Sequence, residues 1–255
     1  MKILIVNYDK MIIQNKEILI FDSPVQLSEA LADAFIMTIQ TSAKRIQSFN
    51  VALSGGSTPR LFFTRLREKA QSVSWQNVHF FWVDERCVPS DDNESNYGLT
   101  KNLLLKHIDI PSQNLNRIWG ENDPETEAER YAELLRQIIR KRDTKIPVFD
   151  WILLGIGEDG HTASIFPGDL PVIHSNAICT VAIHPVTRQK RITLTLPVIN
   201  HAERISFLVS GQNKSVMVRK ILYDETAQSK YPAAMVQSGK TSVEWYLDKD
   251  AAYGL

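Results

Sequence analysis

Residues 49–63, FNVALSGGSTPRLFF, decide the fold, because a short apolar run passes through two glycines directly into a helical pattern. Residues 49–53 predict a buried strand, and Pro59 suits the first turn of a helix, where its missing N–H breaks no hydrogen bond. Gly55 and Gly56 allow backbone N–H groups to approach a ligand closely. The stretch therefore predicts a strand, a loop able to accept an anion, and a helix.

Similar apolar runs recur along the chain and alternate with helical patterns; they lie at residues 2–6, 17–22, 78–83, 148–155, 177–183, 191–196 and 204–211. This alternation is typical of βαβ units, so we expect an α/β fold with a largely parallel sheet flanked by helices. Ser23 and Gln26 predict a capping box before a scaffold helix. The charged residues 123–142 predict a solvated surface helix. No repeat or linker divides the chain, which predicts a single α/β domain over residues 1–255.

The composition argues against several partners. Lysine plus arginine equals aspartate plus glutamate at 29 each, so no overall field favours nucleic acid or an anionic membrane. Cys87 and Cys179 lie far apart without ligand spacing, and the first residues carry charges inside any signal core. No apolar run reaches the roughly 20 residues that span a bilayer. We expect a cytoplasmic protein with no metal.

The loop after the first quoted strand suits phosphate, since the hydroxyls of Ser57 and Thr58 add donors to those of the backbone. An ordinary glycine-rich turn with Thr58 as helix cap explains the same residues equally well, and both interpretations stay open. Ser54 and Ser57 are poor candidates for a hydrolase nucleophile, because SGGS lacks the G-x-S-x-G elbow.

Three charged residues, Asp84, Glu85 and Arg86, follow the apolar run at residues 78–83. Ligands of open α/β sheets bind beyond the carboxyl ends of strands, so we expect these residues to form a turn that opens into a crevice. A solvated ion-pair turn is the alternative. Residues 91–95 are turn and cap formers that predict a loop before a helix near Tyr97.

A tight loop follows the buried run within residues 148–168, VFDWILLGIGEDGHTASIFPG. Its glycines allow His161 to be presented at the end of the strand, where an imidazole can exchange protons near neutral pH. Asp159 is a natural orienting partner for such a base. A purely structural histidine is the competing interpretation.

Lys214 lies in or near the first turn of a predicted helix within residues 204–222, RISFLVSGQNKSVMVRKIL. The helix dipole disfavours a cation there, and a bound anion would remove the conflict. An exposed lysine that reaches solvent is an equally good explanation.

The motifs SGGSTP, WVDERCVP, DDNESNYG, LGIGEDGHTASIFPG, RITLTLP and FLVSGQNKS occur in order from about residue 21 onward. Together they resemble the lactonase branch of the glucosamine-6-phosphate isomerase/6-phosphogluconolactonase family. The resemblance implies a NagB-like, Rossmann-related fold, no cofactor, and hydrolysis of the sugar phosphate lactone 6-phosphogluconolactone. Deaminases of the family typically carry tyrosine at the position of Arg86 and glutamate at that of Phe166, so both positions favour the lactonase.

A lactone is an activated ester, so one water, a base and oxyanion donors suffice for hydrolysis. We expect His161 to be the base, Asp84 or Asp159 to orient the water or the histidine, and Arg86 to contact the carbonyl oxygen or the phosphate. The expected phosphate-binding residues are Gly55, Gly56, Ser57, Thr58, Arg191 and Lys214, of which Arg191 rests on the family pattern alone. A deaminase and a non-enzymatic sugar-phosphate sensor are the alternatives. We expect a monomer or a weak homo-oligomer.

Overall fold

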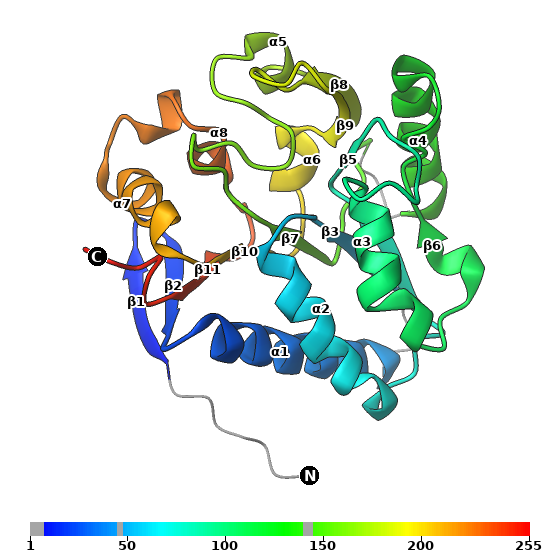
Figure 1. The fold of residues 1–255 in the computed structure, drawn as a ribbon, viewed down its shortest axis with the longest axis horizontal. Helices are drawn as coiled ribbons and strands as arrows, with labels where there is room; N and C mark the ends of the chain where they lie inside the picture. The colour runs from blue at the N-terminus through cyan, green and yellow to red at the C-terminus, as the bar shows by residue number, and fades with distance from the viewer. Residues whose placement is uncertain (1–7, 45–47, 140–144) are drawn as a thin grey trace.

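The computed structural model describes residues 8–44, 48–139 and 145–255. Its centre is an eight-stranded main sheet with helices on both sides (Figure 1), in the order β1-β2-β11-β10-β7-β3-β4-β6. All neighbouring strands pair parallel except β1 and β2. The strands are β1 (Asp9–Ile13), β2 (Lys16–Phe21), β3 (Phe49–Leu53), β4 (Val78–Trp82), β6 (Leu115–Asn116), β7 (Trp151–Leu154), β10 (Ile205–Val209) and β11 (Val243–Asp248). The predicted α/β class with a largely parallel sheet is confirmed.

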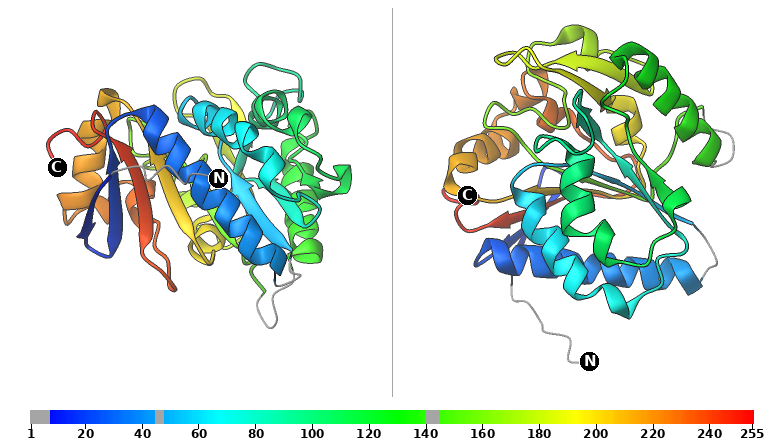
Figure 2. Two further views of the ribbon diagram at one scale, coloured as in Figure 1. Left: turned by 90° about the horizontal axis from the view of Figure 1, so that it is seen from below. Right: turned by 45° about the vertical axis from the view of Figure 1, so that its right-hand side comes forward.

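The helices lie on both sides of the main sheet (Figures 1 and 2), apart from α5, which lies beside β8 (Cys179–Ile183). They are α1 (Pro24–Lys44), α2 (Thr58–Glu68), α3 (Asn96–Leu103), α4 (Pro124–Ile138), α5 (Leu170–Ile173), α6 (Leu196–Asn200), α7 (Ser215–Tyr223) and α8 (Pro232–Met235). Phe35 of α1 is fully buried, and its ring lies within 5.6 Å of the Phe49 and Trp151 rings and 6.3 Å of the Phe80 ring. Such aromatic contacts fasten α1 to three adjacent strands.

Helix starts follow the sequence closely. Ser23 Oγ accepts a hydrogen bond from the Gln26 N–H at 3.3 Å, while the Gln26 side chain accepts one from the Asp22 N–H at 3.1 Å. The predicted capping arrangement therefore forms, with the second bond reaching one residue further back than in the standard box. Ser95 caps α3 in the same way by accepting from the Gly98 N–H, as the prediction of a helix near Tyr97 required.

The interpretation of α4 as a solvated surface helix is wrong for one of its faces. Tyr131 is fully buried, and its hydroxyl exchanges hydrogen bonds of 3.0 Å with the backbone N–H and C=O of Trp82. The sequence did not reveal this face, because the face itself carries a charged residue. Glu127 is buried there and is neutralised by Arg130 Nη2, which lies 2.6 Å from Glu127 Oε1.

Three further strands form a separate, small antiparallel sheet, in the order β5-β9-β8. These strands are β5 (Asp84–Arg86), β8 (Cys179–Ile183) and β9 (Lys190–Leu194). The turn expected at residues 84–86 is therefore wrong. Val83 donates its N–H to Leu53 O in the main sheet and accepts at its own oxygen from Leu194 N of the small sheet. The chain thus bends at Val83 as it passes from one sheet to the other.

Strands β1 and β2 form a hairpin, whereas the predicted strand at residues 2–6 lies outside the described residues. The buried apolar side chains join into one cluster, which supports our proposal of a single domain. Among the described residues, no helix is long and apolar enough to cross a membrane. Nor does any group of three or more His, Cys, Asp or Glu side chains in this part of the chain form a candidate metal site.

Candidate active site

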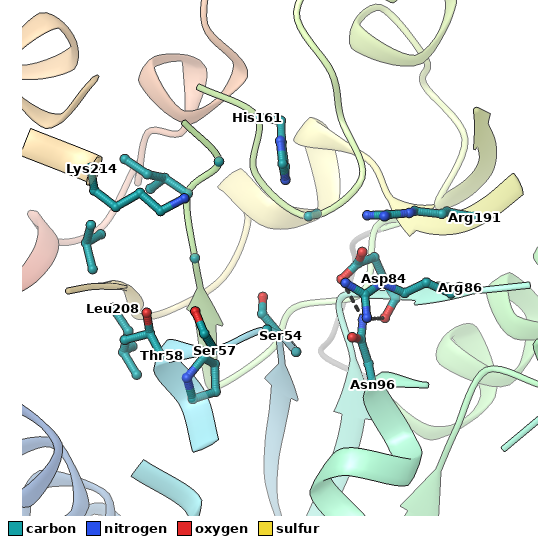
Figure 3. A pocket seen from close by; sticks show the side chains of 18 residues that line it. Ser54, Ser57, Thr58, Asp84, Arg86, Asn96, His161, Arg191, Leu208 and Lys214 are labelled. Atoms are coloured by element: carbon teal, nitrogen blue, oxygen red, sulfur yellow. Dashed lines mark hydrogen bonds between the residues drawn. The ribbon is translucent and has the colours of Figure 1, made fainter. Parts of the chain in front are cut away.

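A cavity of about 180 Å³ lies where β3, β7 and β10 end and the small sheet begins (Figure 3). Every site residue expected from the sequence lines this cavity, apart from Asp159: Gly55, Gly56, Ser57, Thr58, Asp84, Arg86, His161, Arg191 and Lys214. Segments up to about 160 positions apart in the sequence therefore meet at one place. In Figure 3, His161 lies between Lys214 on one side and Arg191 on the other.

The loop between β3 and α2 presents backbone donors to the cavity. Gly56 has φ +103°, a conformation that favours glycine, and no neighbouring atom lies where its side chain would be. Ser57 is the cap residue of α2 but makes no side-chain cap bond. Thr58 is not the cap, and its hydroxyl lies 3.2 Å from that of Ser210. The alternative of Thr58 as a capping residue is thereby removed, and the start of α2 faces the cavity with its positive end.

His161 is held by its own loop. Its Nδ1 lies 2.6 Å from Asp159 Oδ1, which also accepts the His161 N–H at 3.1 Å. A side chain at Gly157 would overlap both the imidazole and the carboxylate, so glycine is needed there. Burial, the largest influence, raises the pKa of Asp159, but the hydrogen bond and charge of His161 outweigh it and leave that pKa below its ordinary value. In a neutral imidazole, a charged Asp159 favours the tautomer with the proton on Nδ1, which leaves Nε2 as the acceptor.

Asp84 is only 5% exposed and is held away from His161 by other partners. Its Oδ2 accepts a hydrogen bond from Ser164 Oγ at 2.7 Å, and its Oδ1 accepts one from Asn96 Nδ2 at 3.2 Å (Figure 3). Of the two candidate orienting carboxylates, Asp159 is the one bonded to the histidine.

Two guanidinium groups share the Asp84 side of the cavity, because Arg86 of β5 is paired with Arg191 of β9 in the small sheet. Burial lowers the pKa of Arg191, and the nearby charge of Asp84 opposes that shift. Within the described part of the chain, the Arg191 Nε is buried without a hydrogen-bond partner, as is the Arg86 Nε. The cavity therefore has two fixed positive charges beside Asp84, which are suited to a developing negative charge.

Lys214 occupies the opposite side of the cavity and is the cap residue of α7. The preceding turn depends on Gly211, whose φ is +93° and whose N–H lies 3.1 Å from both carboxylate oxygens of the buried Asp248. A carboxylate in β11 therefore fixes the loop that carries the lysine.

Sequence reasoning missed Asn96 and the role of Glu85. Asn96 lines the cavity with an Oδ1 that has no partner among the described residues, and its side chain fills the space that a side chain at Gly55 would need. Glu85 is buried and accepts from the N–H groups of Arg86, Asn96 and Tyr97. Burial raises the pKa of Glu85, and these backbone bonds oppose the shift. Only the cap-forming run before Asn96 could have signalled either residue.

Phe166 is 1% exposed and packs against the side chains of His161 and Arg191. Its ring lies 5.0 Å from that of His161, and the Arg191 guanidinium lies 5.7 Å from the ring. The apolar ring supports both groups and adds no second carboxylate beside the histidine.

Comparison with known proteins agrees with this geometry. The family described as glucosamine-6-phosphate isomerases/6-phosphogluconolactonase matches residues 22–245. A Haemophilus influenzae 6-phosphogluconolactonase is 43% identical over 79% of this chain and 85% of that protein. The structure of 6-phosphogluconolactonase from Trypanosoma brucei has 29% identity and a TM-score of 0.83, covering 96% of this chain and all of that one. A monomeric glucosamine-6-phosphate deaminase follows with 25% identity and a TM-score of 0.76, covering 92% of this chain and 98% of that one.

The chain therefore belongs to the glucosamine-6-phosphate isomerase/6-phosphogluconolactonase family. Within it, the chain stands with the 6-phosphogluconolactonases, which are lactone hydrolases.

Proposed function

We propose that this chain hydrolyses 6-phospho-D-glucono-1,5-lactone to 6-phospho-D-gluconate, the second step of the oxidative pentose phosphate pathway, with His161 as the general base. The observation that carries the mechanism is the 2.6 Å contact between His161 Nδ1 and Asp159 Oδ1 at the wall of the cavity. This contact leaves Nε2 free to accept a proton from water, in the way a base needs an orienting partner.

The phosphate is bound on the side of Lys214. Lys214, the Ser57 and Thr58 hydroxyls and the start of α2 lie on that side of His161 (Figure 3), and they supply one full charge, hydroxyl donors and backbone donors. Arg191 was expected in this set from the family pattern, but it lies across the cavity beside Asp84. We therefore assign Arg191, with Arg86, to the lactone carbonyl.

The reaction then proceeds in two balanced steps. His161 Nε2 takes a proton from water while the oxygen forms a bond to C1, and the carbonyl electron pair moves to the oxygen near Arg191. The carbonyl re-forms as the bond from C1 to the ring oxygen breaks, and His161 returns its proton to that oxygen. The new carboxylic acid loses a proton to solvent. The fixed guanidinium charges stabilise the intermediate, and no covalent enzyme intermediate is required.

The test is proton release, measured by pH-stat, from freshly generated 6-phosphogluconolactone with and without the purified protein. Spontaneous hydrolysis is subtracted, and ammonia release from glucosamine 6-phosphate is followed in parallel. We expect acceleration of the first reaction alone, weakened by roughly 10³-fold in His161→Ala and retained in His174→Ala, an exposed histidine outside the cavity. Ammonia release instead would establish the deaminase, and binding of sugar phosphate without either reaction would favour the sensor.

Two further expectations stay predictions from the sequence. A cytoplasmic location and a monomeric or weakly associating state belong to the proposal and call for cell fractionation and sedimentation analysis.

A further inference from the structure

A second cavity, of about 550 Å³, lies at the amino ends of the parallel strands, whereas the catalytic cavity lies at their carboxyl ends. It opens where β2 and β11 begin, since Lys16 and Val243 are the first residues of those strands and are register partners. Polar side chains dominate its lining, among them Gln14, Asn15, Gln237, Ser238, Thr241 and Ser242. The amino ends of the parallel strands thus border a polar hollow that the lactonase mechanism does not use.

Lys16 is the unusual member of this lining. It is only 6% exposed, yet no hydrogen bond or ion pair joins its ammonium group to any part of the chain that the structure describes. Burial alone accounts for the lowered pKa of Lys16, and no neighbouring carboxylate offsets it. The ammonium nitrogen is not one of the fully buried side-chain atoms that lack a partner, so it is accessible from the cavity.

The charge balance of the cavity is one-sided. Its lining contains Lys16 and Lys240 but neither aspartate nor glutamate. Lys240 is already neutralised by Glu203, at 2.7 Å, which leaves the positive charge of Lys16 uncompensated. The amide and hydroxyl side chains around it are donors suited to the oxygens of an anion.

The hairpin turn between β1 and β2 contributes to the rim. Gln14 and Asn15 have φ values of +47° and +64°, the left-handed pair typical of a two-residue hairpin turn. This turn places two amide side chains beside Lys16, within a segment whose register is fixed by pairing on both sides of β2.

We propose that this cavity is a second ligand site, which binds a small hydroxylated anion bearing a phosphate or a carboxylate, with Lys16 as its charge partner. The site is distinct from the catalytic cavity, because the two lie at opposite ends of the parallel strands. It does not depend on the lactonase mechanism.

Inorganic phosphate is the probe, titrated by calorimetry into four proteins: the unaltered chain, Lys16→Met, Lys214→Ala and the double variant. We expect two phosphate sites in the unaltered chain, one in each single variant and none in the double variant. Loss of a charge-assisted hydrogen bond in a buried setting should weaken the second site by roughly tenfold or more. Lys16→Arg keeps the charge and should retain binding.

Two controls separate binding from folding. Lys10→Met removes an exposed lysine of the neighbouring strand and should keep both sites. Lys16→Met should keep full lactonase activity and unfold no earlier than the unaltered chain in phosphate-free buffer, because a mostly buried side chain has lost its unpaired charge. Unchanged phosphate binding by Lys16→Met in the Lys214→Ala background would overturn the proposal, as would the absence of any phosphate site in Lys214→Ala.

Discussion

The two walls of the catalytic cavity are built in different ways. One wall comes from loops that follow parallel strands of the main sheet and carries Thr58, His161 and Lys214. The other comes from the small sheet, where Asp84, Arg86 and Arg191 project from paired antiparallel strands. Loops of the first kind place hydroxyls, backbone donors and a base around a free space, whereas paired strands hold two guanidinium groups beside one carboxylate.

The difference indicates a division of labour. Under the mechanism that we propose, the loop wall binds the phosphate and supplies the base, and the small-sheet wall stabilises the charge that develops on the lactone oxygen. Each prediction below tests one side of that division.

The largest effect is expected for the base on the loop wall. His161→Ala should lower kcat by roughly 10³-fold with little change in KM, since proton transfer is lost while substrate contacts remain. The measurement is steady-state proton release over a range of lactone concentrations. A comparable loss in His174→Ala would show that the assay responds to something other than the base.

The small-sheet wall should give the next effect. Arg191→Met should lower kcat by about 10²-fold, because a fixed charge near the developing oxyanion is removed. Arg188→Met is the matched control, since Arg188 is exposed and lies outside the cavity. A change confined to KM would instead return Arg191 to the phosphate set, as the family pattern first suggested.

A substitution of Glu85 tests whether its buried carboxylate stabilises the small-sheet wall. Glu85→Gln replaces an acceptor of three backbone N–H groups and the Ser95 hydroxyl by a side chain with fewer acceptors. We expect the free energy of unfolding to fall by about 2 kcal/mol, because buried donors lose their partner. Denaturant unfolding measures this, with Glu129→Gln, on the exposed side of α4, as the control. Equal stability of the two variants would contradict the account of Glu85.

The smallest effect concerns stability at acid pH. The pKa of Asp159 is below its ordinary value in the folded chain, so the charged Asp159 adds stability at neutral pH that is lost as the pH falls through the folded pKa. Asp159→Asn should therefore lose slightly less stability than the unaltered chain between about pH 5 and pH 3, measured by denaturant unfolding at each pH. Asp91→Asn, an exposed control, should follow the unaltered chain. An equal loss in Asp159→Asn would contradict the charged partner.

How much could be predicted from the sequence differs between the walls for a physical reason. On the loop wall, local strand–loop–helix patterns predicted Thr58, His161 and Lys214. The rule that ligands bind beyond the carboxyl ends of strands also predicted Asp84 and Arg86 at the site, but not the strand that carries them. The small sheet depends on tertiary pairing between β5 and β9, about a hundred residues apart, which no local pattern specifies. For that reason residues 84–86 were expected as a turn, and the separation of Arg191 from Lys214 was not foreseen.

Glu85 and Asn96 were missed for a related reason. Glu85 reads as one charge among three in the sequence, and only the folded chain shows that it joins β5 to the start of α3. Asn96 reads as a helix-start residue until its contact with Asp84 is seen.

The division of labour is tested most directly with a substrate that lacks the phosphate. Hydrolysis of D-glucono-1,5-lactone and its 6-phosphate should be compared in Lys214→Ala, Arg191→Met and the exposed control Lys220→Ala. We predict that Lys214→Ala weakens kcat/KM roughly 10- to 100-fold for the phosphorylated lactone and not for the unphosphorylated one, whereas Arg191→Met lowers both. Equal losses on the two substrates for Lys214→Ala, or a loss confined to the phosphorylated lactone for Arg191→Met, would contradict the account.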